Sequence, residues 1–290
     1  MLKNTKIRVW LGIITVLILI LAFWNKLSLL RSTEAPAMSV PISTTTIVVY
    51  GDSRSDASTH RKIVDRILLI KPVAVFHTGD FVYDADDRKD WEDTNLVLKP
   101  LIDAIPFFAA AGNHEEESNA YYDNFVLPGN EKWYSLNIAN AHFLVLNTNL
   151  ALDPESEQYA WAAQDLETAS TSDFIIVIAH HPLLSVSKHS GTKLEAADAL
   201  ASLFERYRVS AVFSGHEHNY ERFSRNGIDY IITGGGGAPL YDKITDNQYL
   251  QQFIKAYHFC ALNLAGKRLD LDIYDENGII LDKFTINSRQ

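Results

Sequence analysis

Five short apolar segments of this chain each end in residues that can bind a metal ion. Those residues are Asp52, Asp80, Asn113 with His114, His180 with His181, and His216 with His218. Predicted helices lie between several of these segments, and strands that alternate with helices are typical of an α/β sheet. Binding sites in such sheets form beyond the carboxyl ends of the strands. The sequence therefore predicts an α/β fold in which these polar residues meet at one place.

The expected elements alternate from about residue 46 onward. Strands are predicted at 47–50, 73–76, 107–110, 174–179 and 209–213, with an antiparallel pair at 133–138 and 142–146. Apolar residues spaced three and four apart predict helices at about 63–70, 90–103, 153–169 and 194–204. Four more strands, at 228–233, 257–264, 269–274 and 279–286, make the end of the chain β-rich. No repeat and no second boundary is visible, so residues 46–290 are predicted to form one domain.

An uninterrupted apolar run from Val9 to Trp24 follows three basic residues near the start of the chain. As a helix it would span ~24 Å, somewhat less than the ~30 Å hydrocarbon core of a membrane, and neighbouring apolar residues extend it. We interpret residues 1–30 as either a signal anchor or a cleaved signal peptide. Residues 31–45, rich in Ser, Thr, Pro and Ala, are interpreted as a linker. The predicted location is outside the cytoplasm, anchored to the membrane or secreted or periplasmic.

The charge and the cysteine count exclude several kinds of site. Beyond the first 39 residues the chain carries 21 basic and 35 acidic side chains, which argues against a broad nucleic-acid-binding surface. The single cysteine, Cys260, allows neither an intrachain disulfide nor a thiolate metal cluster. A metal site would therefore use His, Asp, Asn, Glu or Tyr. Its local charge would still attract a small phosphorylated substrate.

The polar segments resemble those of the calcineurin-like metallophosphoesterases, and within them the purple acid phosphatase branch. The matching segments are Gly51-Asp52, Gly79-Asp80-Phe81-Val82-Tyr83, Gly112-Asn113-His114-Glu115, Val177-Ile178-Ala179-His180 and Gly215-His216-Glu217-His218. They fall within roughly residues 46–240. The resemblance implies a four-layer α/β/β/α sandwich as the catalytic domain, here preceded by the N-terminal hydrophobic helix.

Carried over position by position, the resemblance implies two metal ions that share Asp80. The first, expected to be Fe(III), would be held by Asp52, Asp80, Tyr83 and His218. The second, a divalent ion such as Zn, Mn or Fe, would be held by Asp80, Asn113, His180 and His216.

One position departs from the pattern of most of the family. The first motif is usually Asp-x-His, but residue 54 is an arginine, which cannot ligate a metal. Tyr83 stands where purple acid phosphatases place a tyrosinate, a hard anionic donor that favours Fe(III). The loss of a ligand at residue 54 and the gain of one at residue 83 are consistent with each other.

The resemblance also implies roles for residues beside the metals. His114 would be the outer-sphere acid, and His189 would face the substrate. Arg54 is interpreted as a phosphate contact or as a solvated loop residue. His181 is expected to pack near the site without binding metal. The histidines expected to be structural are His60, His77, His142 and His258.

We therefore expect a dinuclear-metal hydrolase of phosphate esters, most simply an acid phosphatase acting by in-line attack of a metal-bound hydroxide. Two alternatives stay open. The same metals can hydrolyse phosphodiesters or nucleotides, and a metal-binding surface protein can keep the ligands without turnover. The four glycines at 234–237 predict a turn with close backbone approach, because no Gly-Lys-Ser/Thr follows them.

Overall fold

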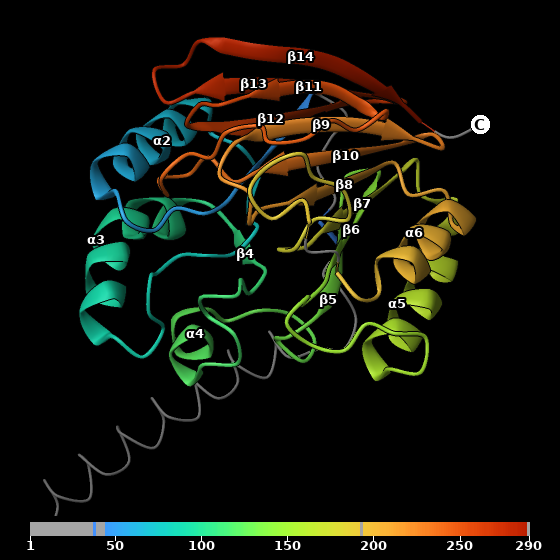
Figure 1. The fold of residues 1–290 in the computed structure, drawn as a ribbon, viewed down its shortest axis with the longest axis horizontal. Coiled ribbons are helices and arrows are strands. Elements are labelled where there is room, and N and C mark those ends of the chain that lie inside the picture. The colour runs from blue at the N-terminus through green and yellow to red at the C-terminus, as the bar shows by residue number, and fades with distance from the viewer. Residues whose placement is uncertain (1–36, 39–43, 192–193, 289–290) are drawn as a thin grey trace, which may run out of the picture.

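Two β-sheets pack face to face, with helices on the outer side of each (Figure 1). The computed structural model describes residues 37–38, 44–191 and 194–288. The predicted N-terminal segment at 1–30 and most of the predicted linker at 31–45 lie outside the described residues. None of the helices in the described part of the chain has the length and apolar character needed to cross a membrane.

The smaller sheet has six strands in the order β14-β13-β12-β2-β3-β4. Their bounds are β2 Thr45–Tyr50, β3 Ala74–His77, β4 Phe107–Ala109, β12 His258–Ala265, β13 Arg268–Asp275 and β14 Ile280–Asn287. Strands β2, β3 and β4 are parallel, and the remaining strands are antiparallel. Two helices connect the parallel strands, namely α2 (Ala57–Ile70) and α3 (Arg88–Ala104). The short helix α4 (Asn119–Asn124) follows β4.

The larger sheet has eight strands in the order β1-β5-β6-β7-β8-β10-β9-β11. Their bounds are β1 Ala37–Met38, β5 Tyr134–Ile138, β6 Ala141–Val145, β7 Phe174–Ile178, β8 Ala211–Ser214, β9 Tyr220–Arg225, β10 Ile228–Thr233 and β11 Leu250–Ile254. Strands β6, β7, β8 and β10 are parallel neighbours. Their connections include α5 (Glu157–Thr168), the 3₁₀ turn η1 (Ala169–Thr171) and α6 (Ala197–Arg206).

Three layers of apolar side chains hold these sheets and helices together. Between the sheets, the rings of Phe76 and Phe143 stack with their centroids 4.5 Å apart. Ile63 of α2 belongs to the layer that covers the outer face of the smaller sheet. Leu166 of α5 and Leu200 of α6 belong to the layer on the larger sheet. Parallel strands covered on both faces are apolar throughout, which is why these strands were recognisable as continuous apolar runs. The two-sheet α/β class predicted from the sequence is confirmed.

The boundaries of some elements differ from the prediction. Helix α5 begins at Glu157, not near Asp153, because the hydroxyl of Ser156 accepts the N–H of Tyr159 at 3.3 Å and caps the helix there. Strand β9 is absent from the prediction because its sequence is rich in charge. Its Glu221 is nevertheless fully buried, so hydropathy alone does not mark the segment as a strand.

Helix α3 offers a matched test of how burial stabilises the fold. Leu98 is fully buried in the apolar cluster that contains Phe76 and Phe143, whereas Leu96 is 69% exposed. Leu98→Ala should lower the free energy of unfolding by about 2–5 kcal/mol, because it leaves a cavity. Leu96→Ala, with the same loss of atoms, should change it by less than about 0.5 kcal/mol. Denaturant unfolding of both variants measures the difference, and equal losses would contradict this packing.

Candidate metal centre

The polar residues that follow five strands meet where the two sheets face each other. Three strands of the smaller sheet, β2, β3 and β4, lead to Asp52, Asp80 and Asn113, and two strands of the larger sheet, β7 and β8, lead to His180 and His216. Hydrogen bonds connect the two sets: the N–H of His216 donates to the Asp52 carboxylate at 3.0 Å, and Asn113 Oδ1 lies 2.9 Å from His180 Nε2. The predicted site is therefore assembled from both sheets.

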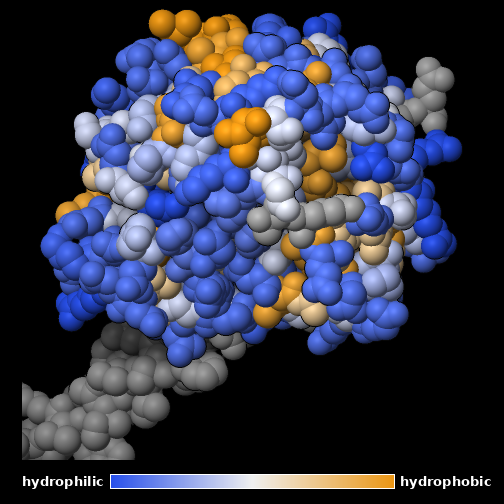
Figure 2. Space-filling model, in the orientation of Figure 1, coloured by the Kyte–Doolittle hydropathy of each residue, from blue (hydrophilic) through white to orange (hydrophobic). Residues whose placement is uncertain are grey.

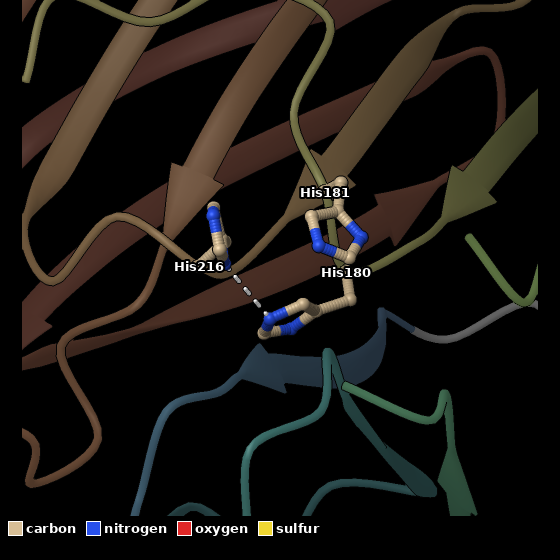
Figure 3. Close-up of side chains that lie close together, drawn as sticks. All are labelled: His180, His181 and His216. Carbon is tan, nitrogen blue, oxygen red and sulfur yellow. Dashed lines mark hydrogen bonds between the residues drawn. The ribbon is translucent and has the colours of Figure 1, made fainter. Parts of the chain in front are cut away.

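One group of candidate ligands consists of His180, His216 and Asn113. Asn113 Oδ1 lies 2.9 Å from His180 Nε2 and 2.8 Å from His216 Nδ1, and the two ring nitrogens are 3.3 Å apart. Figure 3 shows His180 and His216 approaching each other from separate segments, with His181 beside them. The nearest nitrogens of these three histidines lie within 4.8 Å of one another.

The hydrogen bond on the far side of His180 determines which of its nitrogens faces this group. His180 Nδ1–H donates to the carbonyl oxygen of Thr78 at 2.9 Å, and a carbonyl only accepts. The Nε2 lone pair therefore points at Asn113 Oδ1, which is also an acceptor. Acceptor atoms that converge in this way are arranged as the ligands of one cation are, and a carbonyl on the outer nitrogen is the usual way to orient a metal-binding histidine. The donor set fits a divalent metal.

His181 lies close to the same group but is engaged elsewhere. Its Nδ1 is 2.7 Å from the hydroxyl oxygen of Thr148, and its backbone N–H donates to the same oxygen at 3.0 Å. Its ring centroid is 4.6 Å from that of His216. The expectation that His181 packs near the site without binding metal stays a prediction.

A second group consists of Asp52, Asp80 and His218, all buried. His218 Nδ1–H donates to the carbonyl of Pro239 at 2.8 Å, so its Nε2 faces the carboxylates, 3.6 Å from Asp52 Oδ1. Two carboxylates and an imidazole form a hard, anionic donor set that fits a metal cation.

His216 and His218 thus belong to different ligand groups. Regular extended backbone would put them on one face, but the left-handed φ of 68° at His216 turns them apart.

Asp80 lies between the two groups and is rigidly held. Its Oδ1 is 3.3 Å from His180 Nε2, its Oδ2 is 3.4 Å from Arg54 Nε, and it also belongs to the group that contains Asp52 and His218. The buried carboxylate of Glu115 accepts the N–H of Asp80 and of Phe81, each at 2.8 Å, and that of Gly112 at 2.9 Å. These bonds fix Asp80 in a left-handed conformation with φ of 60°, which is rare outside glycine and is often found at functional sites. This positioning role was missed from the sequence, where Glu115 was named only as the last residue of a matching segment.

Burial keeps the imidazoles of the site uncharged at neutral pH. It lowers the pKa of His180 well below its usual value, with the neighbouring His181 adding to the effect. It lowers the pKa of His216 to about 2 and that of His218 to about 4. A neutral imidazole has a free lone pair, so these nitrogens are ready to bind a cation without first losing a proton.

The structure places Arg54 against the candidate ligands and Tyr83 at the surface beside it. Arg54 is not solvated: its Nε–H donates to Asp80 Oδ2 at 3.4 Å and its Nη2–H to His218 Nε2 at 3.3 Å. Tyr83 is 67% exposed, and its ring lies 5.7 Å from the Arg54 guanidinium carbon and 5.4 Å from the ring of His114. The guanidinium, not the phenol, therefore occupies the space beside Asp80 and His218.

His114 and His189 lie at the mouth of the site. His114 Nδ1–H donates to the carbonyl of Tyr83 at 2.6 Å, and His114 Nε2 lies 3.8 Å from Asp80 Oδ2. The ring centroid of His189 is 4.3 Å from that of His216. Both side chains are partly exposed, at 21% and 30%. The structure therefore brings both predicted substrate-side histidines to the centre.

Two buried glutamates hold the loop that carries His189. Glu217 Oε1 accepts the hydroxyl of Ser185 at 2.9 Å and the N–H of His189 at 2.7 Å. Glu221 accepts the hydroxyl of Ser187. The sequence analysis assigned no role to either acid. The sequence shows that both glutamates lie close to His216 and His218 along the chain. Nothing in it indicates that their carboxylates are buried against the loop that carries His189.

With the geometry established, comparison with known proteins decides the family. The sequence model of the calcineurin-like phosphoesterases matches residues 45–220, which is more than half of the chain. The chain belongs to the calcineurin-like phosphoesterase family. The two ligand groups around Asp80 fit the dinuclear metal centre typical of this family.

Relatives of this chain include purple acid phosphatases. Purple acid phosphatase 22 of Arabidopsis thaliana is 28% identical over 234 residues, covering 71% of this chain and 52% of that protein. A protein named probable inactive purple acid phosphatase 1, also from Arabidopsis thaliana, is 24% identical over 329 residues, covering 91% and 53%. The chain spans about half the length of these curated relatives.

Solved structures with the same fold include two that cover most of this phosphoesterase. The purple acid phosphatase PPD1 from yellow lupin seeds has a TM-score of 0.77 and 22% identity, covering 88% of this chain and 55% of that one. GAP50, the anchor in the inner membrane complex of Plasmodium, has a TM-score of 0.70 and 18% identity, covering 85% and 90%. At these identities the likeness shows the fold.

The contact between Arg54 and His218 predicts how metal affinity responds to mutation. His218 Nε2 has one lone pair, so it can accept from Arg54 or bind a metal, but not both. Arg54→Gln removes that competition and a nearby positive charge. The larger of the two metal dissociation constants should therefore fall by at least about tenfold. Calorimetric titration with Mn²⁺, with bound metal counted by elemental analysis, measures it. Arg66→Gln, an exposed site on α2, controls for net charge; equal behaviour of the two variants would contradict the competition.

Proposed function

We propose that this phosphoesterase is a dinuclear-metal phosphomonoesterase of purple acid phosphatase type. The single observation that carries the proposal is the pair of ligand groups on either side of Asp80. The first metal would be held by Asp52, Asp80 and His218, and the second by Asp80, Asn113, His180 and His216. When bound, the metals would polarise the phosphoryl oxygens and activate a water molecule for in-line attack.

The residues around the metals have separable roles in this proposal. His114 donates a proton to the leaving oxygen, since its Nδ1–H is committed to the Tyr83 carbonyl and its Nε2 faces the centre beside Asp80. Arg54 would bind the phosphate, because its guanidinium lies beside Asp80 and His218 at the edge of the site and its N–H groups would be free for phosphate oxygens when His218 holds a metal. His189, held by Glu217, faces the substrate beside His216.

The exposed position of Tyr83 bears on the identity of the first metal. The sequence pattern predicts Fe(III) bound by a tyrosinate. The 67% exposure of Tyr83 and the buried Arg54 guanidinium beside Asp80 and His218 instead favour a first site without a phenolate. We therefore propose divalent ions such as Zn, Mn or Fe in both sites.

Two other functions have specific support. The same metals hydrolyse phosphodiesters or nucleotides in proteins that admit a second ester group, and the centre here is open on the side of His114 and His189. A binding protein without turnover is supported by the name of the probable inactive relative and by the anchor role in the GAP50 name. Retention of both ligand groups and of His114 in this chain favours catalysis.

For the location, we propose that residues 1–30 anchor or export the protein and that the phosphoesterase domain acts outside the cytoplasm. Support comes from the sequence alone, namely the apolar run after three basic residues. The phosphorylated substrate would then be met outside the cytoplasmic membrane. Fractionation of cells that produce the full chain, with protease added from outside, tests the location directly.

The proposed activity predicts a specific pattern of turnover. The full chain, loaded with Mn²⁺ or Zn²⁺, should hydrolyse 4-nitrophenyl phosphate faster than bis(4-nitrophenyl) phosphate, and a chelator should abolish both rates. Asp80→Ala should lose metal from both sites and most of the activity, because it removes the shared ligand. A faster diester rate would favour the phosphodiesterase. No turnover with two metals verified as bound would favour the binding protein.

The proposed acid role predicts a rate effect without metal loss. His114→Gln should keep its metals and lower kcat for an alkyl phosphate by about 10²–10⁴-fold. The loss should shrink for 4-nitrophenyl phosphate, whose leaving group needs little protonation. Steady-state kinetics on both esters, with metal content measured on the same samples, tests it. Equal losses of kcat on the two esters would contradict the proton-donating role of His114.

A further inference from the structure

A cavity of about 490 Å³ opens beside the candidate metal centre. His181, His189 and His216 line it on the side of the centre. Apolar side chains, among them Leu184 and Leu194, form much of its wall. Cavities of this size accept small organic molecules. A phosphate held at the metals would therefore have space beside it for an organic group.

The same cavity is lined by two hydrogen-bond donors that lack partners. Tyr230 is only 4% exposed, and its buried hydroxyl has no hydrogen-bond partner among the described residues. The Nε–H of Arg225 is likewise buried and unpartnered in the described part of the chain. A buried donor without an acceptor costs about 1–3 kcal/mol, so such groups call for an explanation. A bound acceptor would satisfy both.

Arg225 carries a positive charge, which favours an anionic acceptor over a neutral one. Its guanidinium carbon lies 5.6 Å from the ring centroid of Tyr249, a contact that leaves its N–H groups free to donate. The carboxylates that line the cavity, Glu195 and Asp198, are on exposed residues of the α6 region. Burial raises the pKa of Tyr230 to about 12, so its hydroxyl keeps the proton it would donate. The lining thus includes buried donors on Arg225 and Tyr230.

We propose that this cavity binds the leaving group of the substrate, and that this group has an apolar body ending in a carboxylate that accepts from Arg225 and Tyr230. The inference rests on the proposed function, since it assumes a phosphate ester at the metals. The apolar wall selects an aromatic or branched aliphatic body, and the two donors select an oxygen anion over an amine. The substrate class is therefore a phosphorylated hydroxy acid.

A pair of aryl esters tests this selection. The full chain, loaded with metal, should hydrolyse 4-carboxyphenyl phosphate with a kcat/KM at least about tenfold above that for phenyl phosphate. Arg225→Gln should abolish the preference by lowering kcat/KM for the carboxylated ester alone, and Tyr230→Phe should weaken it. Arg206→Gln, an exposed arginine on α6 that does not line the cavity, should leave the preference unchanged.

A binding measurement separates failure of this inference from failure of the proposed function. Calorimetry with 4-hydroxybenzoate, the expected leaving group, should detect binding to the wild-type chain and loss of binding in Arg225→Gln. If neither ester is hydrolysed, the proposed function fails while the binding result still decides the cavity. Equal turnover of the two esters by the wild type, or equal loss of both in a folded Arg225→Gln, would overturn the inference. Thermal unfolding of each variant confirms that it is folded.

Discussion

The arrangement of this protein depends on one buried carboxylate, that of Asp80. It lies between a group of neutral imidazole and amide donors and a group with a second carboxylate, and it contacts both. A buried carboxylate is costly unless its oxygens are satisfied. Glu115 fixes the backbone of Asp80, Arg54 donates to one oxygen, and the N–H of His114 donates to the other. Those three residues follow β2 and β4 of the same sheet as Asp80, whereas the 3.3 Å approach of Asp80 Oδ1 to His180 Nε2 exists only where the larger sheet meets the smaller one. The fold and the site therefore share one constraint.

Arg54 distinguishes this centre from the pattern that the family resemblance implies. A guanidinium is always charged and cannot ligate a metal, yet it stands beside Asp80 and His218. It balances the negative charge of the two carboxylates, which a metal would otherwise have to do alone. In the proposed centre, Arg54 and a metal would compete for the His218 lone pair, so the position of Arg54 would couple metal loading to phosphate binding. The exposed Tyr83 then covers the guanidinium from the outside.

Much of the fold was predictable because its strands are buried on both faces. Continuous apolar runs marked β2, β3, β7 and β8, and helical spacing marked α2, α3 and α6. Strand β9 was missed because burial of Glu221 is explained only by its hydrogen bonds to a loop more than thirty residues earlier in the chain. The seven predicted metal ligands were recognisable from their motifs. The structure brings six of them to the centre and leaves the seventh, Tyr83, at its edge.

The sequence by itself determined the fold class, the family and the identity of most groups at the centre, because strand-end motifs and apolar runs are local patterns that a single chain displays. Tertiary structure alone decided where Arg54 points, which nitrogen of His180 faces the centre, and how Glu217 and Glu221 hold the loop that carries His189. It also decided that Arg225 and Tyr230 line a cavity next to the histidines. Those facts depend on contacts between residues far apart in the chain. Such contacts are determined by how the two sheets pack, and no local sequence pattern displays them.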